Sequence, residues 1–158
     1  MLTRLAASHR NLLADLLRAT PEFSTEDREV ALELIDCTLA TPDSYRFWVD
    51  EDVGADGRGG VRGYICYGAT PMTRGTFDLY WIATHPAHKG KGVGRGLVRA
   101  MEQELEAEGG RLVRVETAGS DEYEATRTFY DRIGYEVVAR IRDFYWPGND
   151  LYIYGRYL

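Results

Sequence analysis

A glycine-rich segment with several basic residues lies near the middle of the chain. It spans residues 88–96, reads HKGKGVGRG, and falls between a stretch with strand character and one with helical periodicity. In a strand, turn and helix arranged this way, backbone N–H groups and the helix dipole converge on one small volume. Glycines let the backbone approach an anion closely, and Lys89, Lys91 and Arg95 add positive charge. The segment predicts a phosphate-binding turn; the alternative is a flexible turn beside cations.

The spacing of the glycines can be compared with two familiar phosphate loops. A dinucleotide-binding fold requires G-x-G-x-x-G, but counting from Gly92 the third glycine would fall on Leu97. A Walker loop requires a Gly-Lys pair followed by Ser or Thr, and the Gly90-Lys91 pair is followed by Gly92. The spacing therefore argues against NAD and against a nucleoside triphosphate as the ligand.

The first half of the chain predicts two helices and a strand hairpin. Ser8 can cap a first helix that ends at Pro21, and Ser24 or Thr25 begins a second one. The leucines at 12, 13, 16 and 17 share one face of the first helix, and the expected inward face of the second includes Val30 and Ala31. Residues 45–50 and 61–69 predict strands joined by a glycine-rich stretch over residues 54–60.

The second half of the chain alternates strand and helix patterns. Strands are predicted at residues 76–83, 112–117, 135–145 and 151–157, helices at 92–108 and 123–133, and a turn at 147–150. Strands interleaved with helices and flanked by hairpins favour an α/β domain with a mixed sheet. The chain length of 158 residues suits a single domain over residues 1–158.

Two segments of this half match motifs of one enzyme family. The pattern [QR]-x-x-G-x-[GA] falls on Lys89, Gly92 and Gly94, and an aromatic-Tyr pair followed by a Gly-aromatic pair falls on residues 129–130 and 134–135. In these motifs, residues 76–146 resemble the GNAT superfamily of acyl-CoA-dependent N-acyltransferases. The resemblance implies the family's α/β fold, a mixed central sheet of about six to seven strands flanked by about four helices.

The resemblance implies acetyl-CoA as co-substrate. The pyrophosphate of CoA is expected on the amides of the turn, and its pantetheine arm along the preceding strand. The expected CoA-binding residues are Ile82, Ala83, Thr84, Lys89, Gly90, Lys91, Gly92, Val93, Gly94, Arg95, Tyr123 and Thr126. Two of them depart from the family pattern: Lys89 stands where Arg or Gln is usual, and Tyr123 where many relatives carry Asn.

The resemblance also suggests catalytic residues. Tyr130 matches the family's general acid beside the CoA sulfur, although it can instead cover the edge of the core. Glu116 stands where acetyltransferases of protein N-termini place a glutamate. Asp78 lies eleven residues before Lys89, where the histone-acetylating branch carries its glutamate. Either carboxylate can be the general base or a structural acceptor, and the Ile82 N–H is the expected oxyanion donor.

These expectations predict an N-acetyltransferase that moves an acetyl group from acetyl-CoA to a primary amine, with a small molecule preferred as acceptor. The amine is expected to attack directly in a ternary complex. Two alternatives stay open: an acetyltransferase of protein N-terminal amines, and a non-catalytic module that binds or senses acyl-CoA.

Composition and charge limit the kinds of partner that the protein is expected to bind. The net charge of -6 argues against nucleic acid, because phosphate contacts need clustered Lys and Arg. No apolar run approaches the ~20 residues of a membrane span, so no membrane partner is expected. The start of the chain lacks the features of a secretory signal, which favours a cytoplasmic protein.

The remaining reactive side chains predict neither a metal site nor a disulfide. The histidines at 9, 85 and 88 and the two cysteines show no metal-ligand spacing. Cys37 and Cys66 both lie where small buried hydrophobic residues are expected. The aromatic residues near the C-terminus allow three interpretations: a wall of the acceptor pocket, a homodimer contact, or packing of an antiparallel strand pair.

Overall fold

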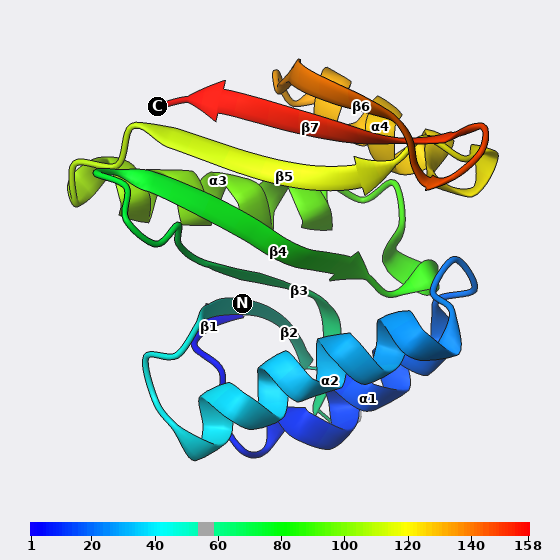
Figure 1. Cartoon of the computed structure of the whole chain (residues 1–158). Helices are drawn as coiled ribbons and strands as arrows, with labels where there is room; N and C mark the ends of the chain where they lie inside the picture. Colours follow the sequence, from blue (N-terminus) through cyan, green and yellow to red (C-terminus); the bar gives the residue numbers. More distant parts are fainter. Residues whose placement is uncertain (54–58) are drawn as a thin grey trace. The chain divides into compact units, whose positions relative to one another are not determined.

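The computed structural model describes residues 1–53 and 59–158, which form seven strands, four α-helices and two short 3-10 helices (Figure 1). In chain order these are β1 (Leu2–Thr3), α1 (His9–Ala19), α2 (Thr25–Ala40), β2 (Arg46–Val53), β3 (Gly59–Ala69), β4 (Thr76–Thr84), η1 (Pro86–His88), α3 (Val93–Ala107), β5 (Leu112–Ala118), η2 (Asp121–Tyr123), α4 (Glu124–Arg132), β6 (Glu136–Trp146) and β7 (Asn149–Tyr157). The strands follow the order β1-β2-β3-β4-β5-β7-β6 in one sheet. Because β4 and β5 are parallel and β5, β7 and β6 antiparallel, the predicted mixed sheet is confirmed.

The described chain divides into two compact units, which are considered separately. The first unit contains Met1–Gly68 and Trp81–Gln103, and the second contains Ala69–Tyr80 and Glu104–Leu158. The sequence prediction of one domain over residues 1–158 stays a prediction.

The first unit has a core between the α1–α2 pair and the hairpin of β2 and β3. Helices α1 and α2 pack against each other. The leucines predicted for the inner face of α1 are buried at 13, 16 and 17. They join Ala31 and Ile35 of α2 and the apolar side chains Phe47, Val49, Val61, Tyr64 and Cys66 of the hairpin. The two-residue strand β1, which the sequence patterns did not predict, pairs with β2.

The two predicted N-terminal caps of these helices differ in the structure. Ser24 forms a full capping box: its hydroxyl accepts the Asp27 N–H at 3.1 Å, and the Asp27 carboxylate accepts the Ser24 N–H at 2.8 Å. Ser8 occupies the cap position of α1, but its side chain makes no capping hydrogen bond. The prediction that Ser8 caps α1 is therefore wrong. Its backbone already has helical angles, which differ from the extended conformation of a capping residue.

The inward face predicted for α2 also needs correction. Val30 is 49% exposed and Cys37 is exposed, whereas Ala31 and Ile35 are buried. Apolar residues occur on several sides of α2, so periodicity alone did not identify the side that contacts the core. Cys66, in contrast, is fully buried as predicted, and burial raises the pKa of its thiol.

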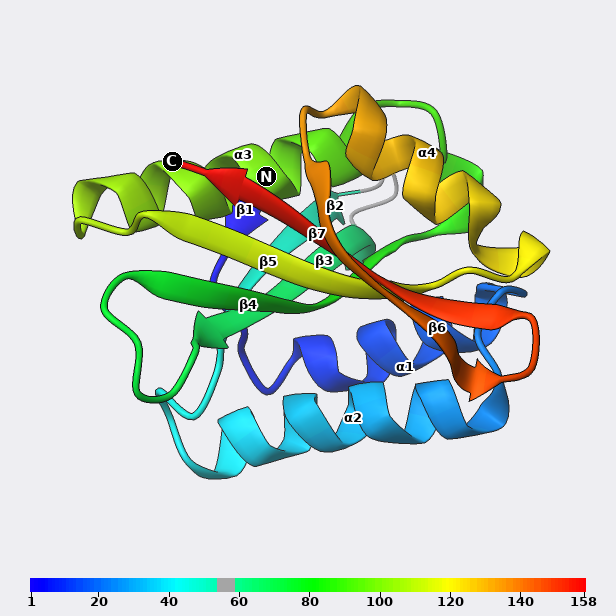
Figure 2. The ribbon, with the colours of Figure 1, turned by 45° about the horizontal axis from the view of Figure 1, so that its top comes forward.

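The second unit contains the parallel pair of β4 and β5 and the antiparallel strands β7 and β6. Helix α4 lies beside β6 and β7 in both views (Figures 1 and 2). Along β5, Val113 and Val115 are buried, while Arg114 and Glu116 lie on the opposite, more accessible face. β7 begins at Asn149, so the turn is shorter than the predicted 147–150.

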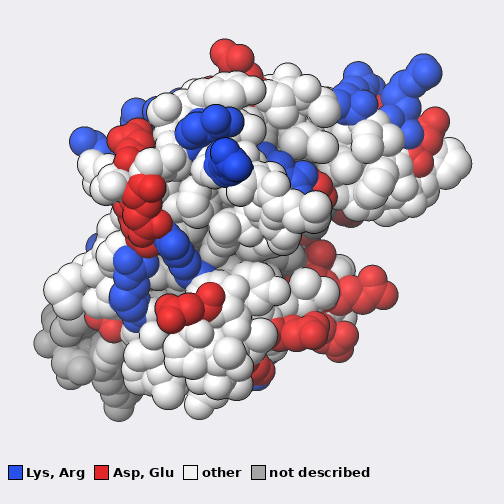
Figure 3. Space-filling view, turned by 60° about the vertical axis from the view of Figure 1, so that its left-hand side comes forward, with Lys and Arg blue, Asp and Glu red and all other residues white. Residues whose placement is uncertain are grey.

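Two further features concern the surface. In the described part of the chain, no helix is both long and apolar enough to cross a bilayer. On the face drawn in Figure 3, Lys and Arg side chains lie next to Asp and Glu side chains and form no continuous basic surface. The predicted glycine-rich connection at 54–60 falls mostly outside the described residues, and β3 begins at Gly59.

Replacing serine by alanine at these two cap positions should lower the free energy of unfolding by different amounts. Ser24→Ala should lower the free energy of unfolding by about 1 kcal/mol, because the Asp27 N–H loses the Ser24 hydroxyl as its acceptor. Ser8→Ala is the matched control and should have a much smaller effect, since Ser8 makes no side-chain cap. Urea denaturation of both variants measures the difference. Equal losses would contradict the assignment of the capping box.

Candidate functional site

The predicted phosphate-binding turn lies in the first unit, between the end of β4 and the start of α3. Gly90 and Gly92 have φ angles of 74° and 82°, in the left-handed region that disfavours side chains. The Gly96 N–H donates to the Gly92 carbonyl at 2.9 Å, which makes Gly92 the residue that caps α3. The N–H groups of the first helical turn, from Val93 to Arg95, have no partner within the helix and can bind an anion.

The space around these glycines suits a phosphate group. A Cβ atom added at Gly90 or Gly92 would meet no heavy atom within 4 Å. An anion can therefore approach the backbone where any other residue would place a side chain. Lys91 and Arg95 are exposed beside the turn. The Lys89 ammonium forms an ion pair with Glu22, which lies between α1 and α2.

Gly63 of β3 supports this turn, although sequence analysis did not identify it. A Cβ atom at Gly63 would lie 2.7 Å from the Ala83 carbonyl oxygen and 2.8 Å from a Val93 methyl group. Only glycine therefore allows β3 to pass so close to the end of β4 and the start of α3. Ile82, Ala83 and Thr84, the expected contacts of the pantetheine arm, are in this part of β4.

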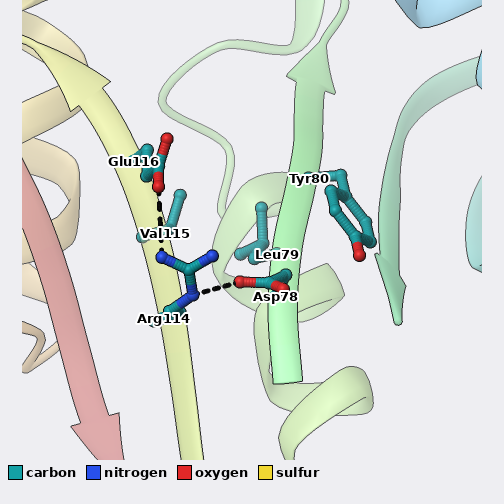
Figure 4. A pocket seen from close by; sticks show the side chains of 6 residues that line it. All are labelled: Asp78, Leu79, Tyr80, Arg114, Val115 and Glu116. Carbon is teal, nitrogen blue, oxygen red and sulfur yellow. Dashed lines mark hydrogen bonds and ion pairs between the residues drawn. The ribbon is translucent and has the colours of Figure 1, made fainter. Parts of the chain in front are cut away.

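The two candidate carboxylates lie together in the second unit, joined by an arginine (Figure 4). The parallel register sets Asp78 of β4 beside Arg114 of β5. The Arg114 Nε atom forms an ion pair with Asp78 Oδ1, and its Nη1 atom lies 3.1 Å from Glu116 Oε1. These side chains line a hollow of about 160 Å³, together with Leu79, Tyr80 and Val115.

The two carboxylates differ in what they can still bind. The Asp78 side chain is only 12% exposed, and both of its oxygens are engaged, since Oδ2 accepts the Thr70 hydroxyl at 2.8 Å. The Glu116 side chain is 48% exposed and forms an ion pair with Arg114. Glu116 therefore has oxygen lone pairs facing solvent, which a substrate proton or a water can reach.

Tyr130 of α4 is almost completely buried, with 2% of its surface exposed. Its ring centroid lies 5.3 Å from that of Phe129 and 5.6 Å from those of Tyr135 and Tyr154. Burial raises the pKa of Tyr130 far above the ordinary value, because a phenolate would be poorly solvated there. The hydroxyl stays protonated at neutral pH and can therefore donate a hydrogen bond.

The predicted site residues are divided between the two units. The first unit holds Ile82 to Thr84 and the turn from Lys89 to Arg95, and the second holds Asp78, Glu116, Tyr123, Thr126 and Tyr130. Within the second unit, Asp78 and Glu116 line the same hollow, and Tyr130 is not among the lining residues. Arg114 was missed by sequence analysis. Its position two residues before Glu116, on the same strand face, was the available signal.

Comparisons with known proteins agree with these observations. A family model for the acetyltransferase (GNAT) domain matches residues 43–137. Among curated proteins, no match was found. A crystal structure from Desulfovibrio desulfuricans, described as an acetyltransferase of the GNAT family, shares 35% identity with a TM-score of 0.91, over 99% of this chain and 98% of that one.

More distant solved structures share the fold. An aminoglycoside 6'-N-acetyltransferase complexed with coenzyme A shows 18% identity and a TM-score of 0.73, over 99% of this chain and 96% of that one. A ribosomal-protein-alanine N-acetyltransferase from Brucella melitensis shows 16% identity and a TM-score of 0.74, over 100% of this chain and 99% of that one.

The contacts of the two carboxylates predict different effects on stability. Asp78→Asn should lower the free energy of unfolding by about 1–3 kcal/mol, because it leaves Arg114 without its buried counter-charge. Glu116→Gln should change it by less than about 0.5 kcal/mol, as is usual for exposed positions. Chemical denaturation checks both values. A larger loss in Glu116→Gln than in Asp78→Asn would show that the structural carboxylate has been misidentified.

Proposed function

Because the chain belongs to the GNAT acetyltransferase family, we propose that it transfers the acetyl group of acetyl-CoA to a primary amine. The thioester supplies an activated acyl group, and the protein must bind it, orient it and remove a proton from the amine. The observation that carries the proposal is a pair of carboxylates that line one hollow but differ in exposure. Asp78 is largely buried, whereas about half of the Glu116 side chain is exposed.

We assign the binding of acetyl-CoA to the turn before α3 and to the end of β4. The amides from Gly90 to Arg95 hold the pyrophosphate, with Lys89, Lys91 and Arg95 adding charge. The backbone of Ile82, Ala83 and Thr84 binds the pantetheine arm, and the Ile82 N–H stabilises negative charge on the reacting carbonyl oxygen. Tyr123 and Thr126 complete the CoA contacts. The open space at Gly90 and Gly92 supports this assignment.

Glu116 is the proposed general base. An amine is mostly protonated at neutral pH and must lose a proton before it can attack. Glu116 can accept that proton directly or through a water, since half of its side chain is exposed. Asp78 is the structural partner that holds Arg114, and Arg114 in turn orients Glu116 through the 3.1 Å contact.

Tyr130 is the proposed donor to the departing thiolate. Its raised pKa keeps the hydroxyl protonated, so the donor is always in the form that this role needs. The same shift makes full proton transfer less favourable, because a buried phenolate is costly. A hydrogen bond that stabilises the sulfur anion is therefore the main contribution that we expect from Tyr130.

The acceptor is proposed to be a small molecule with a primary amine. The hollow has a volume of about 160 Å³, far above the roughly 10–15 Å³ that holds one water molecule, so it can admit an amine-bearing group. The Glu116 carboxylate lines the hollow and favours a cation. The N-terminal amine of a protein also fits a hollow of this volume and charge, and it is the second candidate acceptor. We place this activity in the cytoplasm, as expected from the sequence.

Binding of acetyl-CoA should stabilise the protein. At a ligand concentration of about 100 times Kd, the gain is about 2.7 kcal/mol, which appears as a higher Tm. Gly92→Val should abolish the shift, because the side chain would occupy the space for the phosphate. Gly96→Val, one turn into α3, is the matched control and should retain the shift. A wild-type Tm unchanged by millimolar acetyl-CoA would refute the CoA site.

Substitutions at the reacting groups should separate their roles. Glu116→Gln should lower kcat by roughly 10²-fold at neutral pH, with partial recovery as rising pH deprotonates more of the amine. Tyr130→Phe should lower kcat by a similar factor and leave the Kd of acetyl-CoA nearly unchanged. Asp78→Asn, assayed well below its Tm, is the comparison and should lose much less. Full activity of Glu116→Gln would mean that another group is the base.

A further inference from the structure

Arg114 of β5 has hydrogen-bond donors that its two carboxylate partners leave unused. Its Nε atom pairs with Asp78 Oδ1, and its Nη1 atom donates to Glu116 Oε1 at 3.1 Å. A guanidinium group carries further N–H donors in a rigid planar fork. Within the described part of the chain, no residue accepts a hydrogen bond from the Arg114 Nη2 atom. In Figure 4 this nitrogen has no dashed line and points from β5 towards β4, across the hollow.

Glu116 also has an unused atom beside this donor. Its contact with Arg114 involves Oε1, and among the residues that the structure describes none bonds to Oε2. The exposed fraction of the side chain rises from 12% for Asp78 through 34% for Arg114 to 48% for Glu116. A ligand in the hollow can therefore contact Glu116 Oε2 and Arg114 Nη2 without disturbing the buried Asp78.

The pairing with Asp78 fixes the direction in which the unused donor points. The parallel register places Asp78 of β4 beside Arg114 of β5. The Asp78 carboxylate is itself held by the Thr70 hydroxyl at 2.8 Å. A guanidinium group bound at two of its nitrogen atoms loses little further freedom when a ligand binds to the third. The Nη2 donor is therefore preorganised for binding.

The charge of the hollow limits the kind of group that Arg114 can bind there. Two carboxylates, Asp78 and Glu116, line the hollow against one guanidinium group, so negative charge is in excess. The ammonium group of an acceptor offsets this excess, whereas a carboxylate on the same molecule would restore it. A neutral oxygen, such as a hydroxyl or an amide carbonyl, is therefore the best partner for the Nη2 donor.

We propose that Arg114 selects acceptors with a neutral oxygen on the carbon atom next to the one that bears the amine. The ammonium group of such an acceptor contacts Glu116 Oε2, while its oxygen accepts a hydrogen bond from Arg114 Nη2. Because Nη1 and Oε1 of these side chains are only 3.1 Å apart, the oxygen must lie close to the amine to reach both partners. Amino alcohols and α-amino amides have this arrangement. The inference rests on the acetyl transfer proposed above.

Acetylation rates with a series of small amines test this selection. In this series, 2-aminoethanol carries a hydroxyl, glycinamide an amide carbonyl, glycine a carboxylate, and propylamine no oxygen. The better of 2-aminoethanol and glycinamide should have a kcat/KM roughly 10-fold above that of propylamine, the usual effect of one hydrogen bond from a charged group. Glycine should be a poorer substrate than glycinamide. Rates are compared at equal concentrations of unprotonated amine, because the amines differ in basicity.

Arg114→Lys separates this selection from the positioning of Glu116. Lysine keeps a positive charge between the carboxylates but has no second nitrogen for the acceptor. The preference over propylamine should disappear, mainly through a higher KM for the oxygen-bearing amine. If Arg114 only orients Glu116, kcat should instead fall alike for all amines and the preference should remain. Arg142→Lys on the exposed strand β6 is the matched control and should retain the preference.

The outcomes distinguish this inference from the proposed acetyl transfer. Equal kcat/KM values for propylamine and the oxygen-bearing amines would overturn the selection by Arg114 and leave acetyl transfer intact. A preference for glycine over glycinamide would also overturn it, and so would an undiminished preference in Arg114→Lys that circular dichroism shows to be folded. If that variant does not fold, the wild-type series alone decides. Failure to acetylate any amine would contradict acetyl transfer itself and the inference with it.

Discussion

The Arg114 guanidinium lies between two carboxylates on neighbouring parallel strands, and this interaction is the basis of the role that we propose for each carboxylate. The Arg114 Nε atom forms an ion pair with Asp78, and its Nη1 atom forms one with Glu116. The second oxygen of Asp78 accepts a hydrogen bond from the Thr70 hydroxyl. A buried carboxylate with both oxygens engaged is a poor base, because protonation would break its contacts. The exposed Glu116 keeps its lone pairs accessible. The division of roles therefore follows from burial and pairing.

The turn that we propose for CoA binding depends on a different constraint, the close approach of an anion to the backbone. Positive φ angles at Gly90 and Gly92 leave open space where other residues would carry a Cβ atom. Gly63 meets a similar demand in the neighbouring strand, where any side chain would collide with Ala83 and Val93. Backbone groups thus make up the proposed phosphate site, and the departures from the family pattern at Lys89 and Tyr123 leave those groups intact.

Much of the fold could be predicted from the sequence, because the periodicity of apolar residues and the capping of helices depend on residues close together in the chain. Ser24, one of the two residues predicted to begin α2, caps this helix, and the predicted order of strands and helices is correct apart from the missed β1. The errors arose where the answer depends on neighbours. The exposed side of α2, including Cys37, depends on which face meets the hairpin. Arg114 gains its importance only from the register of β4 against β5, and β6 is exposed because the strand order places it at an edge.

Release of free CoA thiol from acetyl-CoA, measured with a panel of amines, tests acetyl transfer most directly. The panel should contain small primary amines and short peptides with free N-termini, each compared with a reaction that lacks an amine. Our account predicts thiol release that depends on the amine and is strongest with a small molecule. Release no faster than the background with every amine, by a protein that binds acetyl-CoA, would contradict it and favour a non-catalytic module that binds acyl-CoA.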